Sequence, residues 1–222
     1  MFFYDANYTL VKVPITHKIS HRYNTHHTYK TADGKCLKRF RVISKPSLEL
    51  EKKIQELSLD NFYKIEQFLF NKSGNFRGVI MPYYESSEDD ILLKPSDYLS
   101  DNFNSIFQSF LKLADAKIET QDANLENTIF TQNEIIIIDS ERYREYEDEK
   151  HDLPNENYHS AAWILYSALI NASKKHQEFN GINFYNWFYQ TEPDGFEVIK
   201  ELSKYSTPIE YLHQVKQKIK QK

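Results

Sequence analysis

The chain has 222 residues, of which 27% are charged and 15% aromatic, and its formal net charge is −4. This composition excludes a disordered chain and shows no general nucleic-acid signal, and a single cysteine excludes an intrachain disulfide. The first residues lack the basic start and long apolar run of a signal peptide, and no stretch is apolar over the length of a membrane span. We therefore expect a cytoplasmic protein without membrane contact.

The first part of the chain predicts mainly strands, with one helix. Ala32-Asp33-Gly34 is typical of a hairpin turn. The helix is expected to begin near Pro46, because proline favours the first helical turn, and Leu50, Ile54 and Leu57 would form its apolar face. Alternating or β-branched residues predict strands over 8–13, 26–31, 35–42, 62–70 and 76–84.

The second part of the chain predicts mainly helices. An acidic, loop-like stretch over 85–95 separates the two parts, so we expect a β-rich lobe over 1–85 and a helical lobe over 86–222. The fold class expected from this order is α+β. The predicted elements are a helix over 101–118, an irregular segment over 119–127, a hairpin of strands 128–130 and 135–138, a loop over 143–157, a buried helix over 158–172 and two or three short helices after it.

Oxygen-bearing side chains surround the predicted hairpin. Asp122 and Asn127 lie in the segment before it, and Asp139 follows the four isoleucines of 135–138. A carboxylate at the end of a buried strand is held rigidly, and Asn and Asp oxygens are hard ligands suited to magnesium. A nearby carboxylate can orient a hydroxyl and accept its proton. Taken alone, an Asp-x4-Asn pair is common, and the same residues are better explained as loop and turn residues that cap strands.

The order of these parts resembles the protein-kinase-like superfamily, including small-molecule kinases of the aminoglycoside phosphotransferase type. Asp122 and Asn127 fall at the Asp and Asn of the H-R-D-x-x-x-x-N pattern, and Asp139 falls at the Asp of D-F-G. Lys35-Cys36-Leu37-Lys38 stands where V-A-I-K stands. The resemblance covers roughly residues 8–172 and implies a two-lobed fold. It also implies binding of ATP and Mg²⁺, with Asn127 and Asp139 as metal ligands and Asp122 as the catalytic base.

The resemblance implies a nucleotide site in the β-rich lobe. Lys38 would contact the α and β phosphates, and Cys36, which shares its strand face, is small enough to admit an adenine ring. Glu51 resembles the helical glutamate that pairs with this lysine. Glu56 is the rival, because its spacing from Lys38 is closer to the usual one. The alternative for both glutamates is an exposed position on an amphipathic helix.

Ile80-Met81-Pro82-Tyr83-Tyr84 resembles the last strand of the small lobe where it enters the hinge. Met81 would be the gatekeeper, the C=O of Pro82 would accept from the adenine amino group, and the N–H of Tyr84 would donate to adenine. Proline suits the first of these hinge positions because it keeps its carbonyl acceptor. The alternative is that Pro82 simply ends the strand.

The chain also departs from the family pattern. No glycine occurs in 15–22, where a glycine-rich loop would cover the phosphates, so Lys18, His21 and Arg22 would have to compensate with side-chain charge. A metal site made by His17, His21, His26 and His27 is the alternative reading of this region.

The catalytic loop departs from the pattern as well. Thr120 and Gln121 replace its His and Arg, Ser140 follows Asp139 in place of Phe, and Ala161 replaces the aspartate that braces this loop. We therefore expect a divergent kinase that transfers a phosphoryl group to a hydroxyl of a protein or small molecule. The alternative is a pseudokinase that acts as a nucleotide-binding or protein-interaction module, and a third reading is an α+β interaction protein whose motif matches are accidental.

Overall fold

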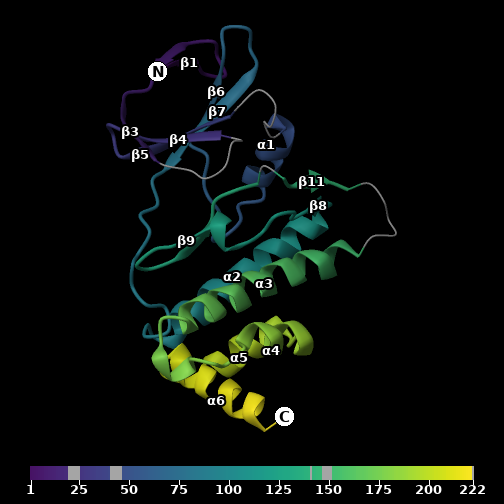
Figure 1. Cartoon of the computed structure of the whole chain (residues 1–222). Coiled ribbons are helices and arrows are strands. Elements are labelled where there is room, and N and C mark those ends of the chain that lie inside the picture. Colours follow the sequence, from purple (N-terminus) through teal and green to yellow (C-terminus); the bar gives the residue numbers. More distant parts are fainter. Residues whose placement is uncertain (20–25, 41–46, 141, 147–151, 222) are drawn as a thin grey trace. The chain divides into compact units, whose positions relative to one another are not determined.

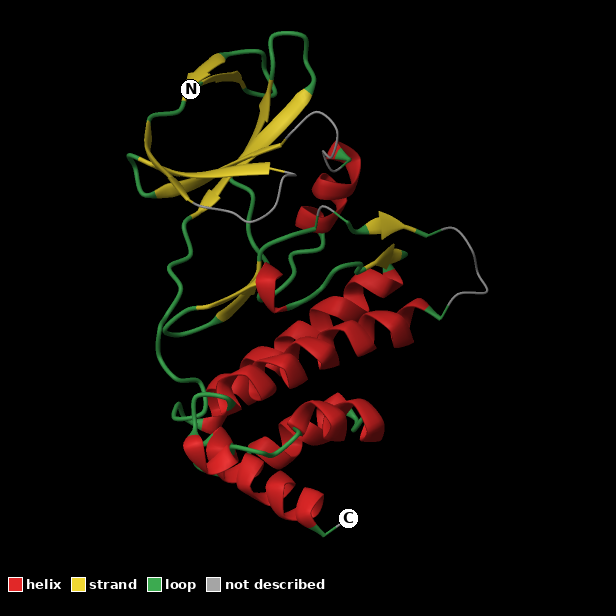
Figure 2. Cartoon of the chain, in the orientation of Figure 1, coloured by secondary structure: helices red, strands yellow, loops and turns green. Residues whose placement is uncertain are grey.

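The computed structural model describes residues 1–19, 26–40, 47–140, 142–146 and 152–221. In this part of the chain the fold is α+β, with a curled antiparallel sheet and six α-helices, α1 to α6 (Figures 1 and 2). The chain divides into two compact units. The first contains Met1–Ser58, Phe62–Glu85 and Asp139–Arg142, and the second contains Leu59–Asn61, Ser86–Ile138 and Tyr143–Lys222.

The first unit is built on a seven-stranded sheet whose neighbouring strands are all antiparallel. Figure 2 shows the curl of this sheet in yellow. Its spatial order is β2-β1-β6-β7-β5-β4-β3, so the central strands come from distant parts of the sequence. The strands are β1 (Phe2–Tyr4), β2 (Leu10–Lys12), β3 (Ile15–Ile19), β4 (His26–Thr31), β5 (Lys35–Phe40), β6 (Gln67–Phe70) and β7 (Phe76–Pro82).

The two faces of the sheet carry separate apolar clusters. One cluster includes Phe3, Leu37 and Ile80, and the other includes Phe40 and Val79. The separation follows from the alternation of side chains along β5 and β7. Lys38 alternates with Leu37, so it lies on the same face as Phe40. This register therefore places a cation beside the second cluster.

Helix α1 (Leu48–Glu56) lies on the side of the second cluster, because its first residue, Leu48, packs against that cluster. The hydroxyl of Ser47 accepts a hydrogen bond from the N–H of Leu50 and caps the helix. Leu50, Glu51 and Ile54 are the buried residues of α1. The predicted helix is confirmed, although Leu57 only caps its end. Burial of Glu51 makes it the one charged residue on the covered face of this helix.

The second unit is mainly helical, and its two longest helices, α2 and α3, lie side by side (Figure 1). Two short antiparallel pairs of strands, β9 with β10 and β8 with β11, accompany them. The elements are α2 (Ser96–Asp115), β8 (Ile118–Glu119), the 3₁₀ helix η1 (Leu125–Asn127), β9 (Thr128–Phe130), β10 (Ile135–Ile137), β11 (Arg144–Glu145), α3 (Leu153–Ser173), η2 (Gln177–Phe179), α4 (Phe184–Thr191), α5 (Gly195–Leu202) and α6 (Pro208–Lys220).

Several predicted elements agree with the structure. The strand over 26–31, the turn at Gly34 and the hairpin of β9 and β10 are confirmed. Gly34 has a φ of 79°, a conformation that glycine adopts readily. Ile135, Ile136 and Ile137 are all buried, as expected of a strand covered on both faces.

Other predictions of secondary structure were wrong. The strand predicted over 62–70 begins only at Gln67, and the buried Phe62 and Tyr63 precede it. Residues 15–19, expected to belong to a loop, form β3. Helix α3 begins at Leu153 inside the predicted 143–157 loop, because Asp152 caps it and Leu153 is buried. Likewise, α2 begins at Ser96, and its buried Leu99 extends the apolar face.

Some expectations concern residues outside the described part of the chain. These include the predicted helix start at Pro46, the end of the strand predicted over 35–42, and the side chains of His21 and Arg22. Of the residues expected in the loop over 15–22, His17 and Lys18 lie on β3 and are exposed. Among the residues that the structure describes, no helix combines the length and apolar character needed to cross a membrane.

Candidate functional site

The central strands of the first unit place two nucleotide-site candidates opposite each other. Cys36 on β5 pairs with Met81 on β7, and both side chains are buried. Directly opposite residues of an antiparallel pair share a face, so Cys36 and Met81 form one apolar surface. Burial raises the pKa of Cys36 to about 11. The thiol is therefore a neutral, packing group at ordinary pH.

Lys38 forms an ion pair with Asp139 inside the first unit. Its Nζ donates to Oδ1 of Asp139 at 2.9 Å, and the two side chains are 7% and 18% exposed. The Nζ also lies 5.7 Å from the ring centroid of Phe40. Two candidates separated by 101 positions in the sequence are thus in direct contact. The contact is a charge-assisted hydrogen bond between two mostly buried side chains.

Glu51 forms a closed set of hydrogen bonds with two hydroxyls that sequence reasoning missed. Tyr63 Oη donates to Oε2 of Glu51, and Ser140 Oγ donates to Oε1, each at 2.5 Å. The two hydroxyl oxygens are themselves 2.5 Å apart. Helix α1 holds Tyr63 in place through Gln55, whose Nε2 donates to the C=O of Tyr63 at 3.3 Å.

Two opposing effects act on the charge of Glu51. Both hydroxyls donate to its carboxyl, which favours the charged form, whereas burial favours the neutral form. The pKa of Glu51 is raised by burial, and the hydroxyls of Ser140 and Tyr63 and the charge of Lys38 oppose that rise. Burial and the neighbouring Glu51 raise the pKa of Tyr63 as well. Burial thus shifts both groups toward their protonated forms.

The rival glutamate lies in a different environment. Glu56 is exposed at the end of α1, whereas Glu51 is only 2% exposed. The charge of Lys38 acts on Glu51, but the carboxyl oxygens of Glu51 accept hydrogen bonds from Tyr63 and Ser140. Pairing of Lys38 with Glu51 stays a prediction.

The predicted hinge begins at the last residue of β7. Pro82 ends this strand and pairs in register with Lys35, which itself forms an ion pair with Glu66 at 2.5 Å. Tyr84 is half-buried, and its hydroxyl accepts from the N–H of Lys64 at 3.3 Å. The contacts of Pro82 and Tyr84 with adenine stay predictions.

In the second unit, the segment that carries Asp122 has an unusual backbone. Asp122 is exposed and has a φ of 60°, in the left-handed region. For a residue other than glycine this conformation costs on the order of 1 kcal/mol, so the surroundings must enforce it. Its Oδ1 accepts from Nδ2 of Asn124 at 2.9 Å, and its backbone C=O accepts from Nδ2 of Asn127 at 2.8 Å. The two asparagines thereby orient the exposed carboxylate.

Asn127 joins this segment to the hairpin. Its backbone C=O accepts from the N–H of Ile138 at 2.9 Å, and Ile138 directly precedes Asp139 in the chain. Nδ2 of Asn127 donates to Asp122, and Oδ1 is the acceptor atom of the same amide. The hydrogen bond from Nδ2 of Asn127 to the C=O of Asp122 thus closes a loop formed by residues 122–127.

The segment is also held by a residue that the sequence reasoning placed in a loop. Asn157 on α3 is fully buried and accepts from both the N–H and the hydroxyl of Thr120 at 2.9 Å. It also donates to the C=O of Phe110 and of Ile118. An asparagine on the buried face of a helix would have indicated a residue with buried hydrogen-bond partners. The sequence did not show it, because the helix was predicted to begin at 158 and Asn157 therefore fell in the predicted loop.

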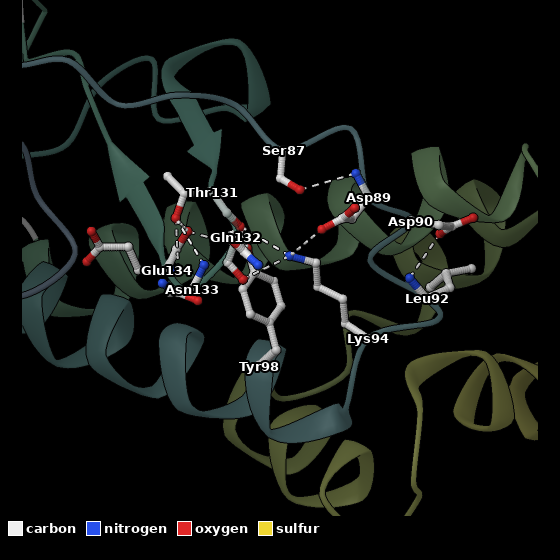
Figure 3. Close-up of polar contacts among 10 residues, drawn as sticks. All are labelled: Ser87, Asp89, Asp90, Leu92, Lys94, Tyr98, Thr131, Gln132, Asn133 and Glu134. Atoms are coloured by element: carbon white, nitrogen blue, oxygen red, sulfur yellow. Dashed lines mark hydrogen bonds and ion pairs between the residues drawn. The ribbon is translucent and has the colours of Figure 1, made fainter. Parts of the chain in front are cut away.

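The turn of the β9–β10 hairpin is held by hydrogen bonds from Lys94 and Tyr98, which precede it in the second unit (Figure 3). Lys94 donates to the C=O of Thr131 and of Gln132 at 3.2 and 3.1 Å, and its Nζ lies 4.1 Å from the ring centroid of Tyr98. Tyr98 Oη donates to the C=O of Thr131 at 2.8 Å. Burial, with Asp89 and Glu134 nearby, raises the pKa of Tyr98 to about 12. These contacts fix the turn of the hairpin.

The donor chemistry of the predicted metal ligands is that of a hard cation. Asp139 offers a carboxylate and Asn127 an amide oxygen, as magnesium prefers. Within the described residues, no group of three or more His, Cys, Asp and Glu side chains is placed to hold a metal. Binding of magnesium by Asp139 and Asn127 stays a prediction.

Comparison with known proteins adds no family. No protein-family model matches the sequence, and no curated protein is significantly similar to it. The roles of the candidate residues therefore rest on their chemistry and their contacts.

Proposed function

We propose that this protein is a divergent kinase-like phosphotransferase that uses ATP and Mg²⁺ and transfers a phosphoryl group to a hydroxyl of a protein or small molecule. In this proposal the first unit is the small lobe of a two-lobed kinase-like fold and holds the nucleotide, and the second unit supplies Asp122 and Asn127. The observation that carries it is the contact of Lys38 with Asp139, two residues far apart in the sequence that stand at the lysine and metal-binding positions of the family pattern.

The local chemistry supports this assignment. Cys36 and Met81 offer a neutral apolar surface suited to an adenine ring, and Lys38 extends from the same sheet face two residues from Cys36. A lysine at this position would bind the α and β phosphates as a point charge once Asp139 turned to the cation. Magnesium, when bound by Asp139 and Asn127, would offset phosphate charge.

Asp122 is the proposed base. The acceptor oxygen would attack the γ phosphorus, the bond from that phosphorus to the β–γ bridging oxygen would break, and ADP would leave with its electron pair. Asp122 would take the proton of the acceptor hydroxyl. The exposure of Asp122 supports this role, because the acceptor must reach it, and the two asparagines that bond it orient its carboxylate.

The test begins with binding. Calorimetric titration with ATP and magnesium is expected to show binding to the wild type, with a large loss in Lys38→Met. Lys35→Met is the matched control, because Lys35 lies on the same strand but pairs with half-exposed Glu66. Transfer is then measured with γ-labelled ATP and a panel of small hydroxyl acceptors and peptides. Absence of nucleotide binding in the wild type would overturn the proposal.

A nucleotide-binding or protein-interaction module is the second candidate. It is favoured by β3, whose residues Ile15–Ile19 contain no glycine, because side chains there keep backbone amides from approaching phosphates closely. Binding of Mg-ATP without transfer to any acceptor, and without slow hydrolysis, would decide for this candidate.

A further inference from the structure

We propose that Asn157 is a positioning residue for Asp122. The inference rests on the proposed function, because Asp122 is its base, but it concerns a residue to which no motif assigns a role. Asn157 lies on the first turns of α3 and is 0% exposed. A buried amide is expensive unless it is bonded, so its partners show what it holds.

Every hydrogen-bonding position of the Asn157 side chain is used. An asparagine amide has two donors and two acceptor lone pairs. Oδ1 accepts from the N–H and from Oγ1 of Thr120, both at 2.9 Å. Nδ2 donates to the C=O of Ile118 at 2.8 Å and to the C=O of Phe110 at 3.1 Å. The N–H and hydroxyl of Thr120 face Oδ1, and the two carbonyls face Nδ2, so these four groups define the orientation of the amide. In the reverse orientation, donors would face donors and acceptors would face acceptors.

These bonds fix the backbone on which Asp122 stands. They hold Ile118 and Thr120, the fourth and second residues before Asp122, and the C-terminal part of α2 through Phe110. Lys117 and Asp122 have φ values of 59° and 60°, so two left-handed residues enclose the segment that Asn157 holds. Such backbone persists only where surrounding contacts over-determine it.

The downstream side of Asp122 is held independently. Asn127 donates to its C=O, and Asn124 donates to its carboxylate. Asn157 supplies the matching constraint from the upstream side. Without it, Thr120 would be left with a buried N–H and hydroxyl that lack this acceptor, and the segment would shift to find others. The carboxylate of Asp122 would then lose its fixed direction.

The first experiment needs no activity. Amide hydrogen exchange is measured in wild type, Asn157→Ala and Leu212→Ala, and Leu212 is a buried position on α6, a helix that packs against α3 and α5. Asn157→Ala is expected to raise exchange at Thr120 by about tenfold or more beyond the rise caused by the global destabilisation that Leu212→Ala measures. Equal exchange in the two variants at matched stability would overturn the inference.

The second experiment reads catalysis. In Asn157→Ala, kcat for phosphoryl transfer is expected to fall about tenfold to a hundredfold while KM for ATP stays within about twofold, because misplacement affects the base and leaves nucleotide binding intact. If this variant does not fold, Thr120→Val removes one hydrogen bond at nearly constant volume, and Thr120→Ser restores that donor and is expected to recover turnover. Equal kcat values for Thr120→Val and Thr120→Ser would contradict the inference.

The two experiments separate two kinds of failure. A wild type that binds and transfers nothing contradicts the proposed function, and hydrogen exchange at Thr120 then decides the positioning role by itself. A wild type that transfers normally, together with Asn157→Ala that keeps its kcat, overturns the positioning role and leaves the proposed function standing.

Discussion

Lys38 Nζ lies 2.9 Å from Asp139 Oδ1, although 101 positions separate the two residues. Strand β5 holds the lysine in the centre of the sheet, and the carboxylate follows the strand β10 and Ile138. Both side chains are mostly buried, so each provides the counter-charge that the other needs. The contact is therefore a structural ion pair. In the proposed function, Lys38 would bind the phosphates of a nucleotide and Asp139 would bind its cation.

Removal of one partner of this pair is expected to destabilise the protein. Lys38→Met should lower the free energy of unfolding by about 2 to 4 kcal/mol, because it leaves the Asp139 carboxylate partly buried without this cation. The double variant Lys38→Met with Asp139→Leu should lose less than the sum of the single variants. Urea unfolding of all four proteins measures this coupling, and additive effects would show that the pair contributes nothing.

Substitution at Asp139 is expected to reduce the magnesium dependence of nucleotide binding. Asp139→Asn keeps the shape of the side chain but removes the charge that a hard cation prefers. ATP affinity measured with and without magnesium should then differ far less than in the wild type. Asp33→Asn, in an exposed turn of the same unit, serves as the control. A full magnesium effect in Asp139→Asn would mean that the cation is bound elsewhere.

A large side chain at Met81 is expected to block adenine. Met81 is buried opposite Cys36, so an indole at this position would occupy the surface proposed for the adenine ring. Met81→Trp should bind ATP at least about tenfold more weakly, whereas Met81→Leu, which nearly conserves volume, should bind almost normally. Circular dichroism checks that both variants fold. Normal ATP binding by a folded Met81→Trp would place the adenine at another site.

Loss of the base at Asp122 is expected to affect transfer and to spare binding. Asparagine is the better replacement than alanine, because it tolerates the left-handed backbone found there. Asp122→Asn should leave ATP affinity nearly unchanged and reduce transfer by about a hundredfold or more. Glu126→Gln, at an exposed position of the same segment, is the control. Undiminished transfer by Asp122→Asn would identify a different base.

The buried carboxyl of Glu51 is expected to make stability depend on pH. Its pKa is raised above the ordinary value of 4.5, so this carboxyl binds more protons in the folded protein than in the unfolded chain just above that pH. The contribution of Glu51 to the free energy of unfolding should therefore fall as pH rises from about 4.5 through its folded-state pKa. Glu51→Gln, which resembles the neutral acid, should remove this part of the slope.

Urea unfolding from about pH 4.5 to about pH 8.5 measures that slope in the wild type, Glu51→Gln and Glu56→Gln. Glu56 lies on the same helix but is exposed, so its substitution should leave the slope unchanged. A wild-type stability that rises over this range and is unaffected by Glu51→Gln would show that Glu51 is ionised in the folded protein.

The sequence by itself determined the elements whose signals are local. The turn at Gly34 follows from a short sequence, the apolar face of α1 follows from helical spacing, and the hairpin that ends before Asp139 follows from two β-branched runs around a polar turn. The candidate residues of the motifs could be named for the same reason, because their order along the chain carries the resemblance. Their roles remain predictions.

Only the tertiary structure decided which polar groups meet. Tyr63 and Ser140 are 77 positions apart, and Thr120 and Asn157 are 37 apart, so no periodic pattern links either pair. The same limit concealed the true start of α3, because its polar stretch resembles a loop. Its buried asparagine, Asn157, makes four hydrogen bonds with three distant residues. A local pattern reports which side of an element avoids water. A buried polar group is stable only through partners that folding brings from elsewhere in the chain, and its identity alone does not name them.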